Sequence, residues 1–266
     1  MGTRPRLLAA TISLALLGAA ALTGPSTAAA PDPSKGSVSI KVANPLVLAG
    51  DPVRFSGVVT PKRAGLKVRL QKRVGSGWRS LAQTRTTAGG RYRLSDAQEF
   101  GGTYQYRVVR LPWLTSSAKS RVVTVQAYVW NAVSDMVQPG DWDSGVQFPD
   151  LESIDGVLYQ DPIVMDADSQ GTVDGGFFEV DLAGLGCAAF DTTAGAVDNN
   201  AGGSRVGIEV KADGASLKKR SFAPGESEQL ILDVRGADVL RVESQVVLAG
   251  PQGKLGLGNP RMLCAS

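Results

Sequence analysis

The chain has no histidine, only two cysteines among 266 residues, and few aromatic side chains (6%). Histidine is the commonest general base and a frequent zinc ligand, so its absence excludes serine and cysteine triads, metalloproteases and most zinc hydrolases. No Gly-x-Ser-x-Gly elbow, phosphate-binding glycine loop or dinucleotide fingerprint is present. Glycoside hydrolysis needs only two carboxylates, but a chain with 25 acidic residues contains such a pair almost inevitably. The sequence therefore favours a non-catalytic protein.

Long apolar runs are also missing, except near the N-terminus. Arg4 and Arg6 precede an apolar run over 7–22, and small residues follow over 26–30. This order is typical of a secretory signal peptide, predicted over residues 1–30, with cleavage after Ala29 favoured. The alternative is a membrane-spanning helix, although the run is short of the usual ~20 apolar residues. We expect a secreted protein, extracellular or associated with the cell wall, with no membrane span.

Two cysteines, Cys187 and Cys264, allow one intramolecular pairing. Export makes a disulfide possible, and closing so long a loop stabilises a fold by roughly 4 kcal/mol in the chain-entropy model. The alternative is a pair of buried free thiols.

The net charge of +3 conceals two halves of opposite sign. Residues 1–127 hold 19 Lys and Arg against 4 Asp and Glu, whereas residues 128–266 hold 9 against 21. Such asymmetry indicates separate modules with different partners, or two solvated surfaces that simply differ. We expect a boundary between residues 127 and 128.

The basic half alternates apolar and polar residues with the period of a β-strand. Turn residues such as Gly50-Asp51 and Gly89-Gly90 bound the runs. About seven short strands are expected: 37–43, 53–59, 66–70, 78–86, 90–94, 103–110 and 119–127. This pattern predicts an immunoglobulin-like β-sandwich over residues 31–127.

The same residues resemble the cysteine-free immunoglobulin-like modules of secreted actinobacterial proteins. The resemblance rests on turn and core positions: 48–51, Val58, Pro61, 65–71, Trp78, Thr87, 90–92, 102–104, Tyr106 and Arg107. It implies a spacer or adhesive module without an active site.

The acidic half opens with an irregular stretch over 131–147 and continues with strand-like runs. These runs cover 156–159, 163–165, 177–182, 206–212, 217–222, 229–234 and 239–248. Asp213-Gly214 is a hairpin signal between two of them. No helical period is sustained, so the half predicts a second sandwich, a jelly roll over residues 128–266. The fold class expected for the whole chain is therefore all-β.

Several segments of this half resemble, in order, the NPCBM domain, a carbohydrate-binding module also classed with family 51. The segments are 133–135, 140–143, 178–185, 194–199, 208–214, 232–234, Gly236, Val239, Leu240 and Val242. The resemblance implies a jelly roll that binds sugar, often galactose-containing glycans, through loops at one end. The sequence departs from the family over 160–165 and 254–260, so no contact residue is transferred onto these segments.

Sugar recognition needs an aromatic face and a few fixed polar groups. The candidates are Trp142 with Asp143, Tyr159, and the cluster Asp198-Asn199-Asn200. Trp142 lies between two aspartates in a loop, which favours an exposed ring. The alternative for both aromatic residues is a role in the core.

Carboxylates also suggest a structural calcium ion, a cation that takes six to eight oxygen ligands. One candidate group is Asp161, Asp166, Asp168 and Asp174, and the other is the region of Asp191 and Asp198. No complete calcium motif is present, so solvated loop carboxylates are the alternative. No other cofactor is expected.

Cations are dense in the basic half: Lys62, Arg63, Lys67, Arg69, Lys72, Arg73, Arg79, Arg85, Arg91 and Arg93. Alternation places Lys67 with Arg69, and Arg91 with Arg93, on outward faces. Outside a cell such a stripe suits teichoic acid, an acidic polysaccharide or a membrane surface rather than nucleic acid. Ordinary solvation is the alternative.

Together these features predict a secreted, non-catalytic protein that binds extracellular or cell-wall glycan through its C-terminal jelly roll. The alternative is a structural or adhesive surface protein whose sandwiches contact other proteins and whose sugar site is lost.

Overall fold

The computed structural model describes residues 36–113, 116–167, 175–200, 205–246 and 253–265. The predicted signal peptide lies outside these residues. The described parts consist of strands and one short 3-10 helix, η1 (Val133–Asp135), so the all-β prediction is confirmed. Within them, no helix has the length and apolar character needed to cross a membrane.

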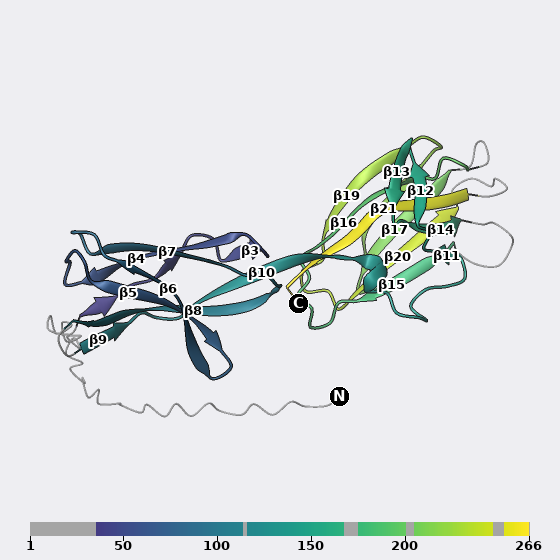
Figure 1. Ribbon diagram of the computed structural model, residues 1–266. Coiled ribbons are helices and arrows are strands. Elements are labelled where there is room, and N and C mark those ends of the chain that lie inside the picture. Colours follow the sequence, from purple (N-terminus) through teal and green to yellow (C-terminus); the bar gives the residue numbers. More distant parts are fainter. Residues whose placement is uncertain (1–35, 114–115, 168–174, 201–204, 247–252, 266) are drawn as a thin grey trace, which may run out of the picture. The chain divides into compact units, whose positions relative to one another are not determined.

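The N-terminal sandwich, as we call residues 36–127, has two sheets (Figure 1). The first contains β1 (Ser37–Val38), β2 (Lys41–Val42), β4 (Pro52–Thr60) and β7 (Arg91–Ala97). In it, β4 pairs with each of the other three strands. The second contains β3 (Leu46–Leu48), β5 (Lys67–Val74), β6 (Gly77–Arg85), β8 (Gly102–Trp113), β9 (Ser116–Lys119) and β10 (Val123–Ala132). Only the β3–β10 pair is parallel among the described strand pairs of this sandwich.

Alternation along the strands builds the core between these sheets. Val53, Phe55 and Val59 of β4 are buried, and residues such as Val68, Leu70 and Tyr106 face them. The rings of Phe55 and Tyr106 lie 4.7 Å apart. Each such burial stabilises the fold by roughly 1.5–3 kcal/mol, and it directs the intervening cations to the outside.

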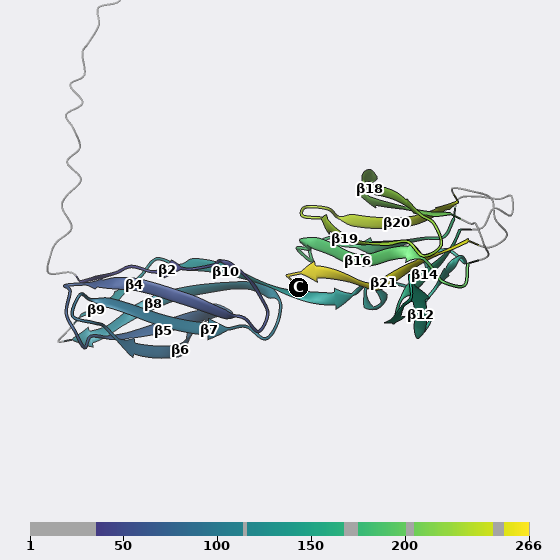
Figure 2. The same ribbon diagram turned by 90° about the horizontal axis from the view of Figure 1, so that it is seen from above.

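The C-terminal sandwich, residues 129–265, has two layers, which Figure 2 shows from above. The first layer contains β11 (Val146–Gln147), β14 (Ile163–Ala167), β16 (Ala189–Ala196), β19 (Ser227–Asp233) and β21 (Gly253–Cys264). The second contains β15 (Phe177–Asp181), β17 (Val206–Ala212), β18 (Ala215–Phe222) and β20 (Val239–Val246). Buried side chains such as Phe178, Phe190 and Leu257 fill the space between them.

Strand β10 pairs with a strand of each sandwich. Residues 123–127 pair with β8, and residues 129–132 pair with β21. The partner therefore changes next to the boundary expected at 127/128, which stays a prediction.

The expected Asp-Gly hairpin is confirmed. Asp213 and Gly214, at φ 48° and 80°, connect β17 to β18. Positive φ at both central residues is the requirement of the tight hairpin turn that Asp-Gly favours.

Two central strands, β16 and β21, were not expected from the sequence. Leu255 and Leu257 of β21 face the core, whereas Gly256 and Gly258 alternate with them on the outer side. A Cβ on Gly256 would lie 2.7 Å from Cδ1 of Ile154, because a hairpin covers this side of the sheet. That hairpin is β12 (Leu151–Ile154) with β13 (Val157–Gln160).

Candidate functional site

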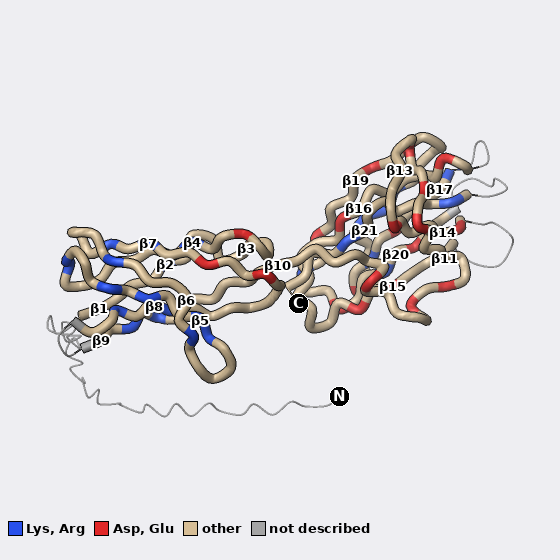
Figure 3. Tube along the Cα trace, viewed as in Figure 1, with Lys and Arg blue, Asp and Glu red and all other residues tan. Residues whose placement is uncertain are grey.

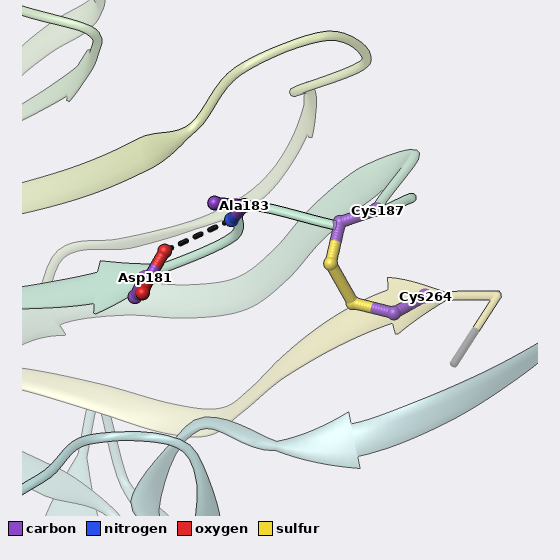
Figure 4. Close-up of a disulfide and its surroundings, with 4 residues drawn as sticks. All are labelled: Asp181, Ala183, Cys187 and Cys264. Carbon is purple, nitrogen blue, oxygen red and sulfur yellow. Dashed lines mark hydrogen bonds between the residues drawn. A yellow bond between two sulfur atoms is a disulfide. The ribbon is translucent and has the colours of Figure 1, made fainter. Parts of the chain in front are cut away.

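A disulfide joins Cys187 to Cys264 and confirms the predicted pairing (Figure 4). Both cysteines are buried; Cys264 ends β21, and Cys187 lies just before β16. The bond therefore fixes the start of one central strand to the end of its neighbour. The free-thiol alternative is wrong, since no free cysteine is present.

Trp142 lies in the turn between η1 and β11 and is partly exposed. It packs against the C-terminal core and forms a backbone bridge with Phe178 of β15. Its ring meets Phe148 edge to face, with the ring centroids 5.2 Å apart. Because Phe148 is 39% exposed, the two rings present an aromatic surface that is anchored on one side and open on the other.

Asp143 follows Trp142 directly in the chain, and its loop is held by hydrogen bonds. Its Oδ1 accepts the N–H of Gly145 at 3.0 Å, and its own N–H donates to the carbonyl of Phe177 at 3.2 Å. The other carboxylate oxygen, Oδ2, has no hydrogen-bond partner among the described residues. A fixed carboxylate with one open oxygen, on the residue that follows an exposed aromatic ring, can accept a hydrogen bond from a ligand hydroxyl.

Tyr159 has a different position from the one expected of a sugar platform. It belongs to β13, and its ring lies directly over Gly258 of β21. It packs with Ile154, Val164 and Val197 in a small cluster between the hairpin and the sheet. This packing is what the core alternative expects of Tyr159, and a role of its ring in ligand binding stays a prediction.

The cluster Asp198-Asn199-Asn200 has two structural members. The Asp198 carboxylate accepts hydrogen bonds from the Ser153 hydroxyl and from the N–H of Gly156 (3.0 Å), so it fastens the β12–β13 hairpin. Asn200 bonds the backbone of Lys254 twice, receiving its N–H at 2.7 Å and donating to its carbonyl at 3.0 Å. Asn199 is exposed. Most polar groups of this cluster are thus already used within the protein.

The two aspartates of the second predicted calcium group, Asp191 and Asp198, lie apart along and beyond β16, and a calcium ion at either stays a prediction. Asp191 is buried, and its carboxylate accepts hydrogen bonds from Arg261 Nη2 at 2.7 Å and from Gln229 Nε2 at 3.1 Å. Asp198 follows the far end of β16, about 20 Å away by the rise of a strand. Of the other candidates, Asp168 and Asp174 lie outside the described residues. No group of three or more potential metal ligands occurs among the residues described.

The predicted sugar-binding residues therefore fall into two groups. Trp142 and Asp143 lie together near the edge of β15, whereas Tyr159, Asp198 and Asn200 support the β12–β13 hairpin. No described contact joins the groups. Phe148 was missed, and its signal was a second aromatic residue only six positions after Trp142 in the same loop region.

Charges on the outer side of the β15–β20–β17–β18 sheet form a connected network, which we call the paired-charge face: Glu179, Glu209, Lys211, Arg241 and Glu243. Lys211 Nζ lies 2.7 Å from Glu243 and 3.8 Å from Glu209, while Arg241 contacts Glu179 at 2.9 Å. Partial burial alone would raise the pKa of Glu243. The hydrogen bonds from Lys211 and Arg241 and the charges of these two residues together lower it by more, so the pKa of Glu243 lies below its ordinary value. The network joins three strands and leaves no cation of the face unpaired.

No protein-family model matches the chain, and no curated protein matches it. Among solved structures, similar ones include two from Clostridium perfringens ZmpB. One contains CBM51-2 and INT domains (15% identity, 63% of this chain and 38% of that chain, TM-score 0.40). The other contains CBM51-2 in complex with GlcNAc and INT domains (14% identity, 85% and 48%, TM-score 0.39).

A third is the CBM36-1 domain of a multidomain xylanase from the hindgut metagenome of Trinervitermes trinervoides (11% identity, 40% and 97%, TM-score 0.22). The chain spans less than half the length of the ZmpB structures. TM-scores below 0.5 do not establish a shared fold or function.

Proposed function

We propose that the chain is an exported, non-catalytic protein that binds extracellular or cell-wall glycan through its C-terminal sandwich. The contact surface is the Trp142–Phe148 pair together with Asp143. The observation that carries the proposal is this pair of rings, anchored on the core and partly open to solvent, with a carboxylate oxygen free beside it.

The chemistry of a pyranose fits such a surface. The C–H side of the sugar packs on an aromatic ring, and hydroxyls bond to fixed polar groups. Because the loop is already held by backbone hydrogen bonds, binding costs little ordering entropy. Export is supported by the disulfide, which persists in oxidising compartments.

Binding of the exported chain to a glycan array and to isolated cell walls tests the proposal. Trp142→Ala and Phe148→Ala should each weaken binding about tenfold, the loss that ~1.4 kcal/mol of contact energy implies. Trp78→Ala is the matched control, because Trp78 lies in the N-terminal sandwich, where Arg107 stacks on its ring at 4.0 Å. Thermal unfolding of each variant separates lost binding from lost folding, since Phe148 is the more exposed ring.

A structural or adhesive role is the second candidate, and an apolar surface favours it. Leu151 and Leu158 lie on the outward side of the β12–β13 hairpin and are 51% and 64% exposed. Exposed apolar side chains grouped on one element are typical of protein contacts. If Leu151→Ser with Leu158→Ser abolishes wall retention while both aromatic variants bind as the wild type does, this second role replaces glycan binding.

A further inference from the structure

The cations of the N-terminal sandwich separate into two groups that the sequence does not distinguish. Lys67 and Arg69 lie on β5, whereas Arg91 and Arg93 lie on β7 in the other sheet. On the β5 side two cations have neutral partners: Arg69 donates to Gln83 at 3.3 Å, and Arg107 stacks on Trp78 at 4.0 Å.

The outer side of the β2–β4–β7 sheet, which we call the arginine face, carries Lys41, Arg54, Arg91 and Arg93. All four are exposed, and none of their side chains makes a hydrogen bond or ion pair with another described residue. Their placement follows from register: Ser56 of β4 pairs with Lys41 on one side and with Arg93 on the other. Arg54 pairs with Ser95, so it lies diagonally from Arg93, about 7 Å away.

Two adjoining hollows follow this face. The larger, of about 710 Å³, is lined by Lys41, Arg85, Arg91 and Arg93 together with Ser56 and Gly57. The second, of about 580 Å³, shares Ser56 and Arg93 and adds Arg54. Neither has a carboxylate in its lining.

The lining of the larger hollow includes several residues with small or short side chains, Gly57 among them. Ser56, Thr84 and Thr87 contribute only short polar side chains. The result is a groove with a neutral floor and cationic walls.

We propose that the arginine face binds a linear polymer, other than nucleic acid, with phosphate groups in its backbone. Arg91 and Arg93 are two residues apart on one strand, so their side chains emerge about 7 Å apart along the groove. A phosphodiester has two unesterified oxygens, and guanidinium groups on either side can bond both. A chain whose charge lies in its own backbone can bring its phosphates directly along this row of arginines, whereas an acidic polysaccharide carries its carboxylates on bulky sugar rings.

This site is independent of the glycan site proposed above, because it lies on the other sandwich. Binding there should depend little on pH, because the described residues that line the two hollows include neither a carboxylate nor a histidine.

Binding of long-chain inorganic polyphosphate to the exported chain tests the proposal. Arg91→Gln with Arg93→Gln should weaken binding at least about tenfold and lower the slope of log affinity against log salt by roughly 0.7 per cation removed. Arg69→Gln with Arg79→Gln is the matched control, since it removes the same charge from the β5–β6 side, and it should change affinity less than about threefold. Arg93→Gln alone, with unfolding measured for every variant, guards against a folding defect.

Equal loss in both double variants would overturn the proposal, since the attraction would then be a property of net charge. Polygalacturonate, a linear polymer that carries carboxylates instead of phosphates, is measured beside polyphosphate. Tighter binding of polygalacturonate than of polyphosphate, or polyphosphate binding that falls as pH drops from about 7 to 5, would overturn the choice of phosphate. Preference for single-stranded DNA over polyphosphate would overturn the ligand class by showing base recognition.

Discussion

Both sandwiches carry cations on an outer sheet face, but carboxylates accompany those cations in only one of the two. Figure 3 shows many Lys and Arg with few Asp and Glu along the N-terminal sandwich, and both kinds of residue along the C-terminal one. On the paired-charge face, Lys211 and Arg241 contact carboxylates on neighbouring strands. On the arginine face, Arg91 and Arg93 have no such contact with any described residue. The comparison teaches that the position of a few carboxylates, rather than the number of cations, decides whether a charged face is closed or available to a ligand.

The two sandwiches also differ in whether a covalent bond joins their strands. Cys187–Cys264 fastens β16 to β21 in the C-terminal sandwich, whereas residues 36–127 contain no cysteine. The N-terminal sandwich thus depends on its apolar core, in which Phe55, Leu70 and Tyr106 are fully buried. Three changes, from the largest expected effect to the smallest, can break or sharpen this contrast.

Removing the disulfide should have the largest effect. The double variant Cys187→Ser with Cys264→Ser gives the unfolded chain more conformational freedom, because the bond closes a loop with a sequence separation of 77. The chain-entropy model gives a loss of roughly 4 kcal/mol in the free energy of unfolding. Denaturant unfolding followed by tryptophan fluorescence and circular dichroism measures it.

If the two sandwiches are stabilised separately, removing the disulfide should destabilise only the C-terminal sandwich. Amide hydrogen exchange of β4 and β7 should stay unchanged while protection of β16 and β21 falls. Equal loss of protection in both sandwiches would show that they unfold as one cooperative unit and would remove the distinction.

Breaking the paired-charge face should cost less. Glu243→Gln leaves Lys211 and Arg241 without their shared carboxylate and should lower the free energy of unfolding by about 1–2 kcal/mol. Glu99→Gln is the matched control, since Glu99 is exposed in the N-terminal half. The expected change for Glu99→Gln is below about 0.5 kcal/mol.

The same carboxylate predicts the sign of a pH effect. The pKa of Glu243 is lowered in the folded state, so its stabilisation is present above the ordinary value of 4.5 and is lost as pH falls through the folded value. The stability difference between wild type and Glu243→Gln should therefore shrink as the solution is acidified below that value. A difference that stays constant over this range would show that the carboxylate charge is not involved.

The sequence predicted those strands whose outward face is polar. Val206, Ile208 and Val210 alternate with Gly207, Glu209 and Lys211, and that alternation is visible along β17. In β21 the outward positions 256 and 258 are glycines, because the β12–β13 hairpin covers them. A strand buried on both faces has no polar alternation to detect.

The candidate site was predictable only in part for a related reason. A loop tryptophan between aspartates identified Trp142 and Asp143, both of which lie at an open aromatic surface. Asp198 and Asn200 have the residue types of a binding cluster, yet they bond the hairpin turn and the backbone of Lys254. Residue type shows that a polar group can bond, whereas only the fold shows that its partner is already inside the protein.

The arginine face itself should contribute least to stability, and in the opposite direction. Arg91→Gln with Arg93→Gln removes two like charges about 7 Å apart, whose repulsion in water is on the order of 0.5 kcal/mol. The variant should therefore be as stable as the wild type, or more stable by up to about that amount. Its gain should be larger at about 0.01 M salt than at about 0.15 M, because screening weakens the repulsion.

Lys211→Gln on the paired-charge face supplies the contrast. It should destabilise the chain at low salt, since it removes a cation that bridges Glu209 and Glu243. Chemical unfolding of both variants at the two salt concentrations measures the opposite signs. A loss of stability in the arginine variant would mean that Arg91 or Arg93 holds the fold together, and a face already used for folding is not free to bind a polyanion.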